Sequence, residues 1–414
     1  MTKPMGPIPA GFAADADAML LIGGRRADEL VAAAGDSPLF VYDLDRVDAQ
    51  IARFRAAFGG IDLHYAIKAN SYIQLLARVA KQVDGLDVAS GGELRLALKA
   101  GADPASISFA GPGKRDWELG DAIKAGVTLN CESEGEAERA LAIAAKLGRT
   151  PRLAVRVNPD FEIKGSGMRM GGGAKPFGVD AERVPALVRR IIDAGADWRG
   201  FHIFAGSQAL AAEALIEAQA ATVALAGELA GKIGAGPPLV NLGGGFGIPY
   251  FHGEQPLDVE AVGAALRGEL NRRAEILAGS RFAIELGRWL VGEAGVYLTR
   301  ILDRKVSHGK TFLVTDGGMH HQLAASGNFG QVVRRNYPVA IASRFGAEAE
   351  EEVSIVGCLC TPLDRLADDV MAPRAEPGDL VAVFLAGAYG LSASPQAFLG
   401  QQPAREMVVG NSAD

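Results

Sequence analysis

The residue in this sequence with the most distinctive chemistry is Lys68, which closes a short apolar stretch that begins at Ile61. The residue types of that stretch predict a buried β-strand, so the Lys68 ammonium group would lose part of its hydration. A desolvated lysine gives up its proton more readily and can form a Schiff base with an aldehyde. The alternative is a lysine that extends to solvent from the end of a strand.

Eight short apolar runs, separated by stretches with helical spacing, lie between residues 61 and 287. Eight strands that alternate with helices over this length predict an α/β fold, the (β/α)8 TIM barrel. Both faces of such strands are buried, which fits runs that are apolar almost throughout. The runs cover residues 61–68, 85–90, 106–110, 127–132, 152–158, 200–205, 239–243 and 281–286.

The functional groups of such a barrel collect where its strands end, so we expect the residues that close the runs to face one mouth. A glycine-rich turn after the seventh strand would let backbone N–H groups approach a phosphate, with Ser207 as a further donor. An ordinary tight turn between strand and helix is the alternative for these glycines. The residues at the ends of the runs are Lys68, Asp87, Arg156, Phe204, Ser207, Gly243, Gly244, Gly245, Glu285, Gly287 and Arg288.

A second domain is predicted after about residue 290, where short β-like segments alternate with turn residues. They cover residues 296–302, 311–315, 353–356 and 380–384, and they predict a mostly antiparallel β-domain. Residues 20–44 also contain short strands around one helix, so this domain could draw its first strands from the N-terminus. We therefore expect a barrel over residues 41–288 and a discontinuous β-domain from residues 1–40 and 289–414.

The hexapeptide Tyr65-Ala66-Ile67-Lys68-Ala69-Asn70 resembles the lysine motif of the fold type III pyridoxal-phosphate (PLP) decarboxylases, the diaminopimelate and ornithine decarboxylase family. Four further stretches match in the family's order, with Leu286 in place of a proline. They are residues 243–247, 285–288, 360–364 and 387–389. Residues 109–115, 164–168 and 201–208 are most similar to the exosortase A system-associated subgroup, which is encoded with exopolysaccharide functions.

This resemblance implies PLP as the cofactor and a role for each matching residue. Lys68 would hold PLP, Glu285 would keep the pyridine nitrogen protonated, and Tyr389 would reach the phosphate. Cys360, supplied by the neighbouring subunit, would protonate the carbanion left by CO2, so the resemblance also implies a homodimer with shared active sites. Cys358 competes for this role, because on a strand it would point to the same face. Residues assigned to the substrate are Arg288, Arg335, Tyr337, Thr361 and Asp364.

Two departures from the family's pattern concern the substrate. Phe204 occupies the place of a histidine that stacks on the cofactor ring, and a phenyl ring stacks without carrying charge. Thr361 replaces an acidic residue that holds the distal ammonium group of a diamine, which weakens selection for such substrates. Some relatives with the Phe204-containing motif act on amino acids tethered to carrier proteins. The pair Arg334–Arg335 could meet an anionic substrate end or a carrier's phosphate, or could simply be solvated.

Composition excludes several other classes of function. A formal net charge of −7 argues against nucleic acid or an anionic membrane as the main partner, and no apolar run is long enough to span a bilayer. Three cysteines form no disulfide framework and the N-terminus does not resemble a signal peptide, so we expect a cytoplasmic protein. The pair His320–His321 invites a metal site, but the turn before it fits the family's β-domain. We expect no metal.

The function predicted from the sequence is PLP-dependent decarboxylation of an L- or D-amino acid. Its substrate would resemble diaminopimelate, ornithine or lysine, or would be bound to a carrier, and the Cα–carboxylate bond would break in an external aldimine. A racemase or epimerase that uses the same cofactor is one alternative. A PLP-binding protein without catalytic activity is the other, although a proton donor such as Cys360 speaks against it.

Overall fold

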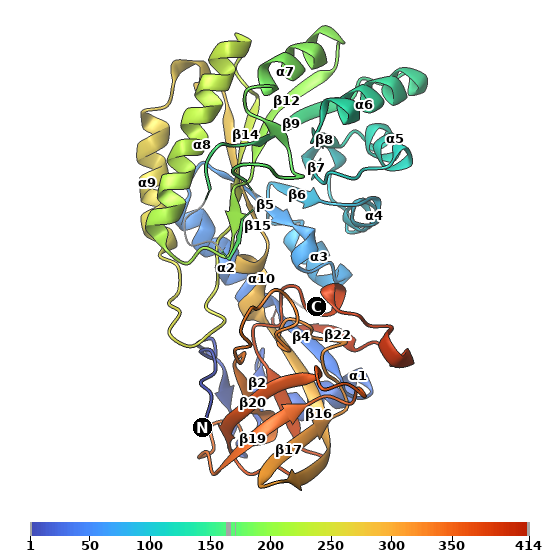
Figure 1. Cartoon of the computed structure of the whole chain (residues 1–414), viewed down its shortest axis with the longest axis vertical. Helices are drawn as coiled ribbons and strands as arrows, with labels where there is room; N and C mark the ends of the chain where they lie inside the picture. The colour runs from blue at the N-terminus through green and yellow to red at the C-terminus, as the bar shows by residue number, and fades with distance from the viewer. Residues whose placement is uncertain (1, 163–166, 170, 412–414) are drawn as a thin grey trace. The chain divides into compact units, whose positions relative to one another are not determined.

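The computed structural model describes residues 2–162, 167–169 and 171–411 and separates into two compact units (Figure 1). We call Ile51–Gly247 with Pro256–Gly287 the barrel unit. Met1–Gln50, Ile248–Gln255 and Arg288–Asp414 form the β unit. The predicted domain boundaries, a barrel over residues 41–288 and a β-domain from residues 1–40 and 289–414, remain a proposal.

The barrel unit contains the predicted (β/α)8 barrel. Its strands pair in parallel in the order β9-β12-β14-β15-β5-β6-β7-β8, and pairing between β8 and β9 closes the ring. The strands are β5 (Asp62–Ala66), β6 (Gly85–Val88), β7 (Ile107–Phe109), β8 (Thr128–Cys131), β9 (Arg152–Asn158), β12 (Asp197–Ile203), β14 (Leu239–Gly244) and β15 (Arg281–Leu286). Two-residue strands add to the loops: β10 (Met168–Arg169), β11 (Val179–Asp180) and β13 (Gly206–Ser207).

Local sequence signals determine where the surrounding helices begin and end. Ser90, Ser133 and Asp258 each accept a hydrogen bond from a backbone N–H of the first helical turn. Gly126 and Gly148 end two helices in the left-handed conformation. The helices are α2 (Leu44–Ala57), which spans the boundary between the units, α3 (Ile73–Val79), α4 (Gly91–Lys99), α5 (Asp116–Ala125), α6 (Glu134–Leu147), α7 (Val184–Asp193), α8 (Ala212–Ile233) and α9 (Val259–Asn271).

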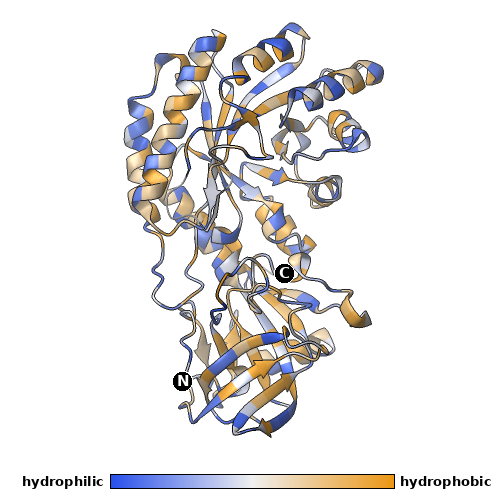
Figure 2. Cartoon of the chain, viewed as in Figure 1, coloured by the Kyte–Doolittle hydropathy of each residue, from blue (hydrophilic) through white to orange (hydrophobic). Residues whose placement is uncertain are grey.

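The two faces of the barrel strands differ in polarity. One set of alternate residues, including Leu63, Val155 and Ile284, is apolar and fully buried, and the helices carry bands of hydrophobic residues (Figure 2). The other set is polar, and its members contact one another across strands; for example, Asn130 Nδ2 donates to Ser108 Oγ at 2.5 Å. This buried polar set comprises His64, Asp87, Ser108, Asn130, Arg156, His202, Asn241 and Glu285.

The β unit is built on a mostly antiparallel sheet in the order β18-β21-β16-β17-β19-β20, and β4 joins it by pairing with β16 and β22. Its main strands are β4 (Leu39–Asp43), β16 (Gly295–Ser307), β17 (Lys310–Thr315), β18 (Val339–Ile341), β19 (Glu351–Val356), β20 (Arg365–Ala372), β21 (Leu380–Val383) and β22 (Arg405–Val409). Through the antiparallel pairing of β4 with β16, residues 39–42 belong to this sheet.

Smaller elements complete the β unit. The strands β1 (Ala13–Ala14), β2 (Leu20–Ile22) and β3 (Arg25–Arg26) form a separate sheet and precede α1 (Ala27–Ala34), and α10 (Arg288–Val291) follows β15 in the chain. In the core, the rings of Phe40 and Tyr297 lie 4.7 Å apart and both residues are fully buried. Within the ranges that the structure describes, no helix has the length and apolarity needed to cross a bilayer.

Candidate active site

Lys68 lies just beyond β5, in the one-turn 3-10 helix η1 (Ile67–Ala69). Ile67 and Ala69 are buried on either side of it, whereas 45% of the Lys68 side chain is exposed. The following residues hold this turn, because Tyr65 Oη donates to the Asn70 carbonyl at 2.8 Å and Asn70 Oδ1 accepts from Tyr72 N at 2.9 Å. A rigid turn therefore presents an accessible amine at the end of the strand.

Glu285, near the end of β15, is the acidic partner of this amine. Its Oε1 lies 3.6 Å from Lys68 Nζ, and its Oε2 accepts a hydrogen bond from His202 Nε2 at 2.9 Å. Burial alone would raise the pKa of Glu285, but the Lys68 and Arg156 charges and the hydrogen bond from His202 hold that pKa well below its ordinary value. Glu285 is therefore a buried carboxylate that stays ionised.

Asp87 lies at the end of β6, beside the strand that leads to Lys68. His64 Nδ1 approaches Asp87 Oδ2 to 3.3 Å, and within the described part of the chain neither Asp87 oxygen makes a hydrogen bond. Burial opposes protonation of His64, yet the charge of Asp87 outweighs it and raises the pKa of His64. Two carboxylate oxygens without hydrogen-bond partners in a buried position are suited to contacts with a bound ligand.

The glycine-rich turn after β14 packs against neighbouring strand ends. Gly243 and Gly245 have φ angles of +69° and +86°, which favour glycine. A Cβ on Gly243 would lie 2.6 Å from the Ile203 carbonyl oxygen, and one on Gly244 would lie 1.7 Å from the Glu285 carbonyl oxygen. Glycine is thus required here because three strand ends converge. Ser207 is half-buried in β13, in the adjacent loop, where it pairs with β10.

Phe204 and Gly287 flank the lysine. Lys68 Nζ lies 5.5 Å from the centroid of the Phe204 ring, within the range of a cation–π interaction. A Cβ on Gly287 would lie 2.8 Å from Ala69 Cβ, so glycine lets the chain after β15 pack against the turn that carries Lys68. The barrel unit thus brings Lys68, Phe204 and Glu285 together.

The β unit contains a separate cluster around Arg288. The Arg288 guanidinium carbon lies 4.8 Å from the ring centroid of Tyr389 and 5.6 Å from that of Tyr250, whose ring is 4.9 Å from that of Tyr337. Arg335 stacks on Phe251 at 3.7 Å and pairs with Glu254 at 3.3 Å. The predicted residues Arg288, Tyr337 and Tyr389 therefore share one cluster, with Tyr250 as a member that the sequence did not reveal.

The arginine before Arg335 has a different environment. Arg334 lies 2.6 Å from Asp368 Oδ2 and donates to the carbonyl oxygens of Ser326 and Arg365. Its guanidinium is therefore committed to contacts within the β unit. Only Arg335 of this pair, with 54% of its side chain exposed, has the accessibility that a contact with a substrate would need.

Cys360 lies in an irregular loop between β19 and β20 and is exposed. Cys358 is predicted as an alternative proton donor because on a strand it would point to the same face as Cys360. This segment is not a strand, so that argument does not apply. Cys358 is half-buried with its Sγ 3.5 Å from the Asp316 carbonyl oxygen, and burial raises the pKa of its thiol. Thr361 Oγ1 accepts from Leu363 N at 3.4 Å. Of the two thiols, Cys360 is the more accessible.

Asp364 holds the loop that carries these cysteines. Its two carboxylate oxygens accept hydrogen bonds from Met319 N at 2.6 Å and Leu359 N at 2.8 Å. A Cβ on Gly318 or on Gly357 would lie within 2.3 Å of the Asp364 carboxylate, so glycine at both positions makes room for it. The assignment of Asp364 to the substrate therefore stays a prediction that competes with this structural role.

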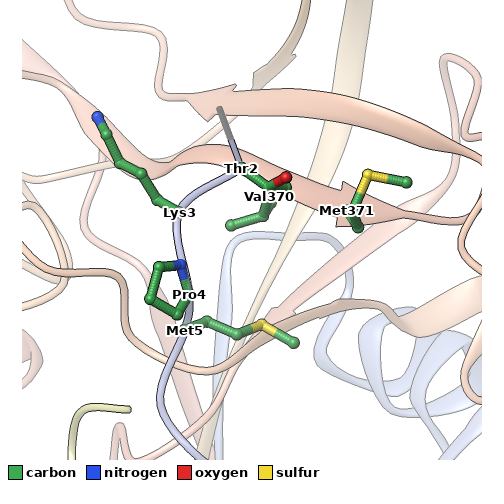
Figure 3. Close-up of a pocket in the computed structure, with 6 residues that line it drawn as sticks. All are labelled: Thr2, Lys3, Pro4, Met5, Val370 and Met371. Carbon is green, nitrogen blue, oxygen red and sulfur yellow. The ribbon is translucent and has the colours of Figure 1, made fainter.

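His321 is engaged through both ring nitrogens, since Nδ1 lies 3.1 Å from Tyr297 Oη and Nε2 lies 2.8 Å from the Gln402 carbonyl oxygen. Among residues 2–162, 167–169 and 171–411, no group of three or more histidine, cysteine or acidic side chains could hold a metal ion. An open pocket in the β unit is lined by Thr2, Lys3, Pro4, Met5, Val370 and Met371 (Figure 3), and none of the predicted site residues lines it.

Sequence reasoning missed three buried residues of the barrel mouth: His64, His202 and Glu132. His202 could have been found, because it lies two residues before Phe204 in the predicted strand 200–205, where alternation would place both on one face. His64 precedes Lys68 by four residues but is identified only by its cross-strand contact with Asp87. Residues 164–166 of the predicted subgroup loop 164–168 lie outside the described residues.

A barrel that carries an accessible lysine amine and a buried ionised carboxylate at the ends of its strands is suited to Schiff-base chemistry. Comparison with known proteins identifies the family: residues 44–292 match the pyridoxal binding domain of the pyridoxal-dependent decarboxylases. The chain belongs to this family, the fold type III PLP-dependent decarboxylases, and its cofactor is PLP. The accessible Lys68, the Asp87 oxygens without hydrogen-bond partners and the glycine-rich turn all fit that cofactor.

Two curated relatives match along almost the whole chain. The chain is 36% identical over 385 residues to the L-glutamyl-[BtrI acyl-carrier protein] decarboxylase of Niallia circulans, which covers 91% of this chain and 90% of that protein. It is 32% identical to the diaminopimelate decarboxylase of Methanothermobacter thermautotrophicus, with coverage of 94% and 90%. The structure of M. jannaschii diaminopimelate decarboxylase with L-lysine superposes on this chain with a TM-score of 0.87 and is 25% identical to it in sequence. The match covers 98% of this chain and 94% of the other. The chain is thus a PLP-dependent amino-acid decarboxylase.

Proposed function

We propose that this decarboxylase acts on an amino acid tethered to a carrier protein, and that free diamines are poor substrates. The observation that carries this proposal is Thr361, a neutral side chain at the position where the resemblance to the diamine decarboxylases implies an acidic residue that holds the distal ammonium group. A neutral hydroxyl leaves a distal ammonium without its counter-ion but tolerates a distal acyl linkage. The carrier-bound substrate named for the 36% identical relative supports the same conclusion.

Residues of the barrel unit would bind the cofactor. Lys68 would hold the cofactor covalently, and Asp87, Arg156 and Phe204 would line its ring. The bound PLP ring supplies an electron sink when the Cα–carboxylate bond breaks. Glu285, ionised because Lys68 and His202 face it, would hold a proton at the ring nitrogen. Ser207 and the glycines 243–245 would bind the phosphate.

The proposal also gives roles to residues of the β unit. When the bond between Cα and the carboxylate carbon breaks, the carboxylate leaves as CO2. The Cys360 thiol would then transfer its proton to Cα and regain one from solvent. Its exposure in a loop supports this role. Arg288 and Tyr389 would contact the phosphate region, and Arg335, Tyr337 and Thr361 would meet the substrate's distal part. We also propose a homodimer in which Cys360 serves the partner subunit's Lys68, and a cytoplasmic enzyme associated with exopolysaccharide functions.

A CO2-release screen tests the substrate proposal. The protein, with PLP added, is given glutamate and other amino acids as carrier-linked thioesters, and diaminopimelate, ornithine and lysine in free form. We expect turnover on a carrier-linked substrate and kcat/KM at least about tenfold lower for each free diamine. The variant Thr361→Asp should reduce this difference by raising kcat/KM for the free diamines. Faster turnover of a free diamine by the unaltered protein would refute the proposal, and racemisation without CO2 release would refute decarboxylation.

A further inference from the structure

Glu132 follows β8 directly and forms a buried ion pair with Arg156 of β9. Glu132 Oε1 lies 2.9 Å from Arg156 Nη1, and only 2% and 8% of the two side chains are exposed. A buried charge-assisted hydrogen bond of this length fixes the geometry of both groups. Loss of the carboxylate would remove the ion-pair partner that the buried Arg156 guanidinium has among the described residues, which is strongly unfavourable.

Glu132 also connects loops on both sides of its own strand. Gly111 N, in the loop after β7, donates to Oε1, and Gly178 N, in the loop after β9, donates to Oε2 at 3.2 Å. Gly178 has a φ angle of +76°, and a Cβ there would lie 2.9 Å from Asn158 N, so glycine makes this close approach possible. One carboxylate thus ties together the loops that follow three consecutive barrel strands.

Arg156 lies near the end of β9, and the parallel strands β5 and β15 carry Lys68 and Glu285 at their corresponding ends. The central carbon of the Arg156 guanidinium lies 5.0 Å from the centroid of the Phe177 ring, so one side of Arg156 packs against an aromatic residue while Nη1 is held by Glu132. Its charge is also among those that lower the pKa of Glu285. Arg156 is therefore anchored by one carboxylate, and its charge acts on the carboxylate next to Lys68.

We propose that Glu132 is a positioning residue for the cofactor site, because it fixes the Arg156 guanidinium and the two flanking loops in the orientation that receives PLP. This inference rests on the proposed contact of Arg156 with the cofactor, and it goes further by naming the group that maintains that contact. Glu132 itself would not touch PLP. Its contribution lies in preorganisation, which removes the need to order Arg156 when the cofactor binds.

A second buried ion pair nearby provides a matched control. Glu136 Oε1 lies 2.7 Å from Lys114 Nζ, with 3% and 1% of the side chains exposed. Lys114 Nζ also donates to the carbonyl oxygens of Gly111 and Asn130. Glu136 thus matches Glu132 in charge, burial and location but makes no hydrogen bond or ion pair with Arg156 among the described residues. A purely structural role predicts the same consequences for loss of either carboxylate.

The test measures PLP affinity of the apoprotein by absorbance titration, and urea stability of the same preparations, for Glu132→Gln and Glu136→Gln. We expect Glu132→Gln to raise the PLP dissociation constant about tenfold or more, as loss of an outer-sphere partner commonly does. We expect Glu136→Gln to leave this constant within about twofold, although both variants lose stability. Equal changes in PLP affinity for the two variants, or unchanged affinity in Glu132→Gln, would overturn the inference.

Two further variants test whether Glu132 affects PLP affinity through Arg156. In an Arg156→Gln background, Glu132→Gln should reduce PLP affinity by a smaller factor than it does alone, because the guanidinium that it positions is already absent. Full additivity of the two effects, or wild-type affinity in Arg156→Gln alone, would contradict the proposal. If Glu132→Gln does not fold, Glu132→Asp provides the alternative variant, because it keeps the charge. Its PLP dissociation constant should lie within about threefold of the wild-type value. A loss of PLP affinity as large as that of Arg156→Gln would contradict the proposal. CO2 release is not part of this test, so its outcome is independent of the substrate proposal.

Discussion

At the scale of single residues, the barrel mouth combines two carboxylates with two buried histidines. Glu285 contacts His202 and Lys68, and Asp87 faces His64. Isolated charges in such a position would be costly, so each carboxylate has a basic neighbour. The arrangement leaves Lys68 as the accessible nucleophile and gives Glu285 a stable negative charge that can hold a proton on a cofactor ring.

Glu285→Gln should lower kcat for CO2 release by about 100-fold or more, because a neutral amide cannot keep the ring nitrogen protonated. The matched control is Glu118→Gln, which alters another buried carboxylate of the barrel unit that accepts from Gly91 N. Steady-state kinetics of both variants, with saturating PLP, provide the measurement. A Glu285→Gln enzyme within about threefold of the control would contradict the proposed role.

Sequence motifs located part of this site and missed the rest for a physical reason. Lys68 and Glu285 lie in short segments whose residue types signal chemistry on their own. His64, His202 and Glu132 do not, because their importance comes from contacts between strands that are distant in the chain. A lone buried histidine or glutamate has no local signature until the register of the sheet is known.

At the scale of elements, the loop between β19 and β20 depends on Asp364. Its two oxygens cap Met319 N and Leu359 N, so Asp364→Asn would replace one acceptor with a donor that faces a backbone N–H. We expect the free energy of unfolding to fall by about 1 to 3 kcal/mol and the alkylation rate of Cys360 to change. If Asp364 instead binds substrate, KM should rise while stability in urea and thiol reactivity remain those of the wild type.

His321 should make the protein less stable as the pH falls. Burial, together with neighbouring His320, lowers its pKa from 6.5 to about 4. Its Nε2–H donates to the Gln402 carbonyl, and Nδ1 accepts from Tyr297 Oη, so the folded state favours the neutral ring. Because the unfolded chain takes up this proton first, the contribution to stability is complete above about pH 6.5 and is lost as the pH falls toward 4.

This pH dependence is measured by urea unfolding of the wild type and His321→Gln at pH 7.5, 6 and 5. The wild type should lose up to about 1.4 kcal/mol per pH unit more than the variant within this window, since one titrating group sets that limit. Parallel losses in the two proteins would show that His321 does not titrate as described.

The regular elements were predictable from the sequence to different degrees. The eight barrel strands were predicted almost in full, because one face of each strand is apolar and the polar residues of the other face, such as Arg156, interrupt the runs only singly. In the β unit, β20 (Arg365–Ala372) was missed because Arg365, Asp368 and Asp369 interrupt its apolar pattern. The cysteine loop was open to interpretation as a strand, since Cys-Leu-Cys has the composition of one but is held in a turn by Asp364.

At the scale of the whole molecule, the proposed homodimer makes a quantitative prediction. Lys68 belongs to the barrel unit and Cys360 to the β unit, and the proposal pairs the lysine of one subunit with the cysteine of the other. Mixing inactive Lys68→Ala and Cys360→Ala proteins, with subunit exchange, should restore about a quarter of the sites, because half of the dimers are mixed and each has one intact site. Absence of recovery in mixtures shown to exchange subunits would exclude shared sites.

The central claim is a covalent bond between the Lys68 amine and the PLP aldehyde. Borohydride reduction of the purified protein with PLP, followed by peptide mapping, tests this claim most directly. We predict a single stable pyridoxyl adduct on the peptide that contains Lys68, and none in Lys68→Ala. An adduct on another lysine, or no adduct in a protein that binds PLP, would contradict the account.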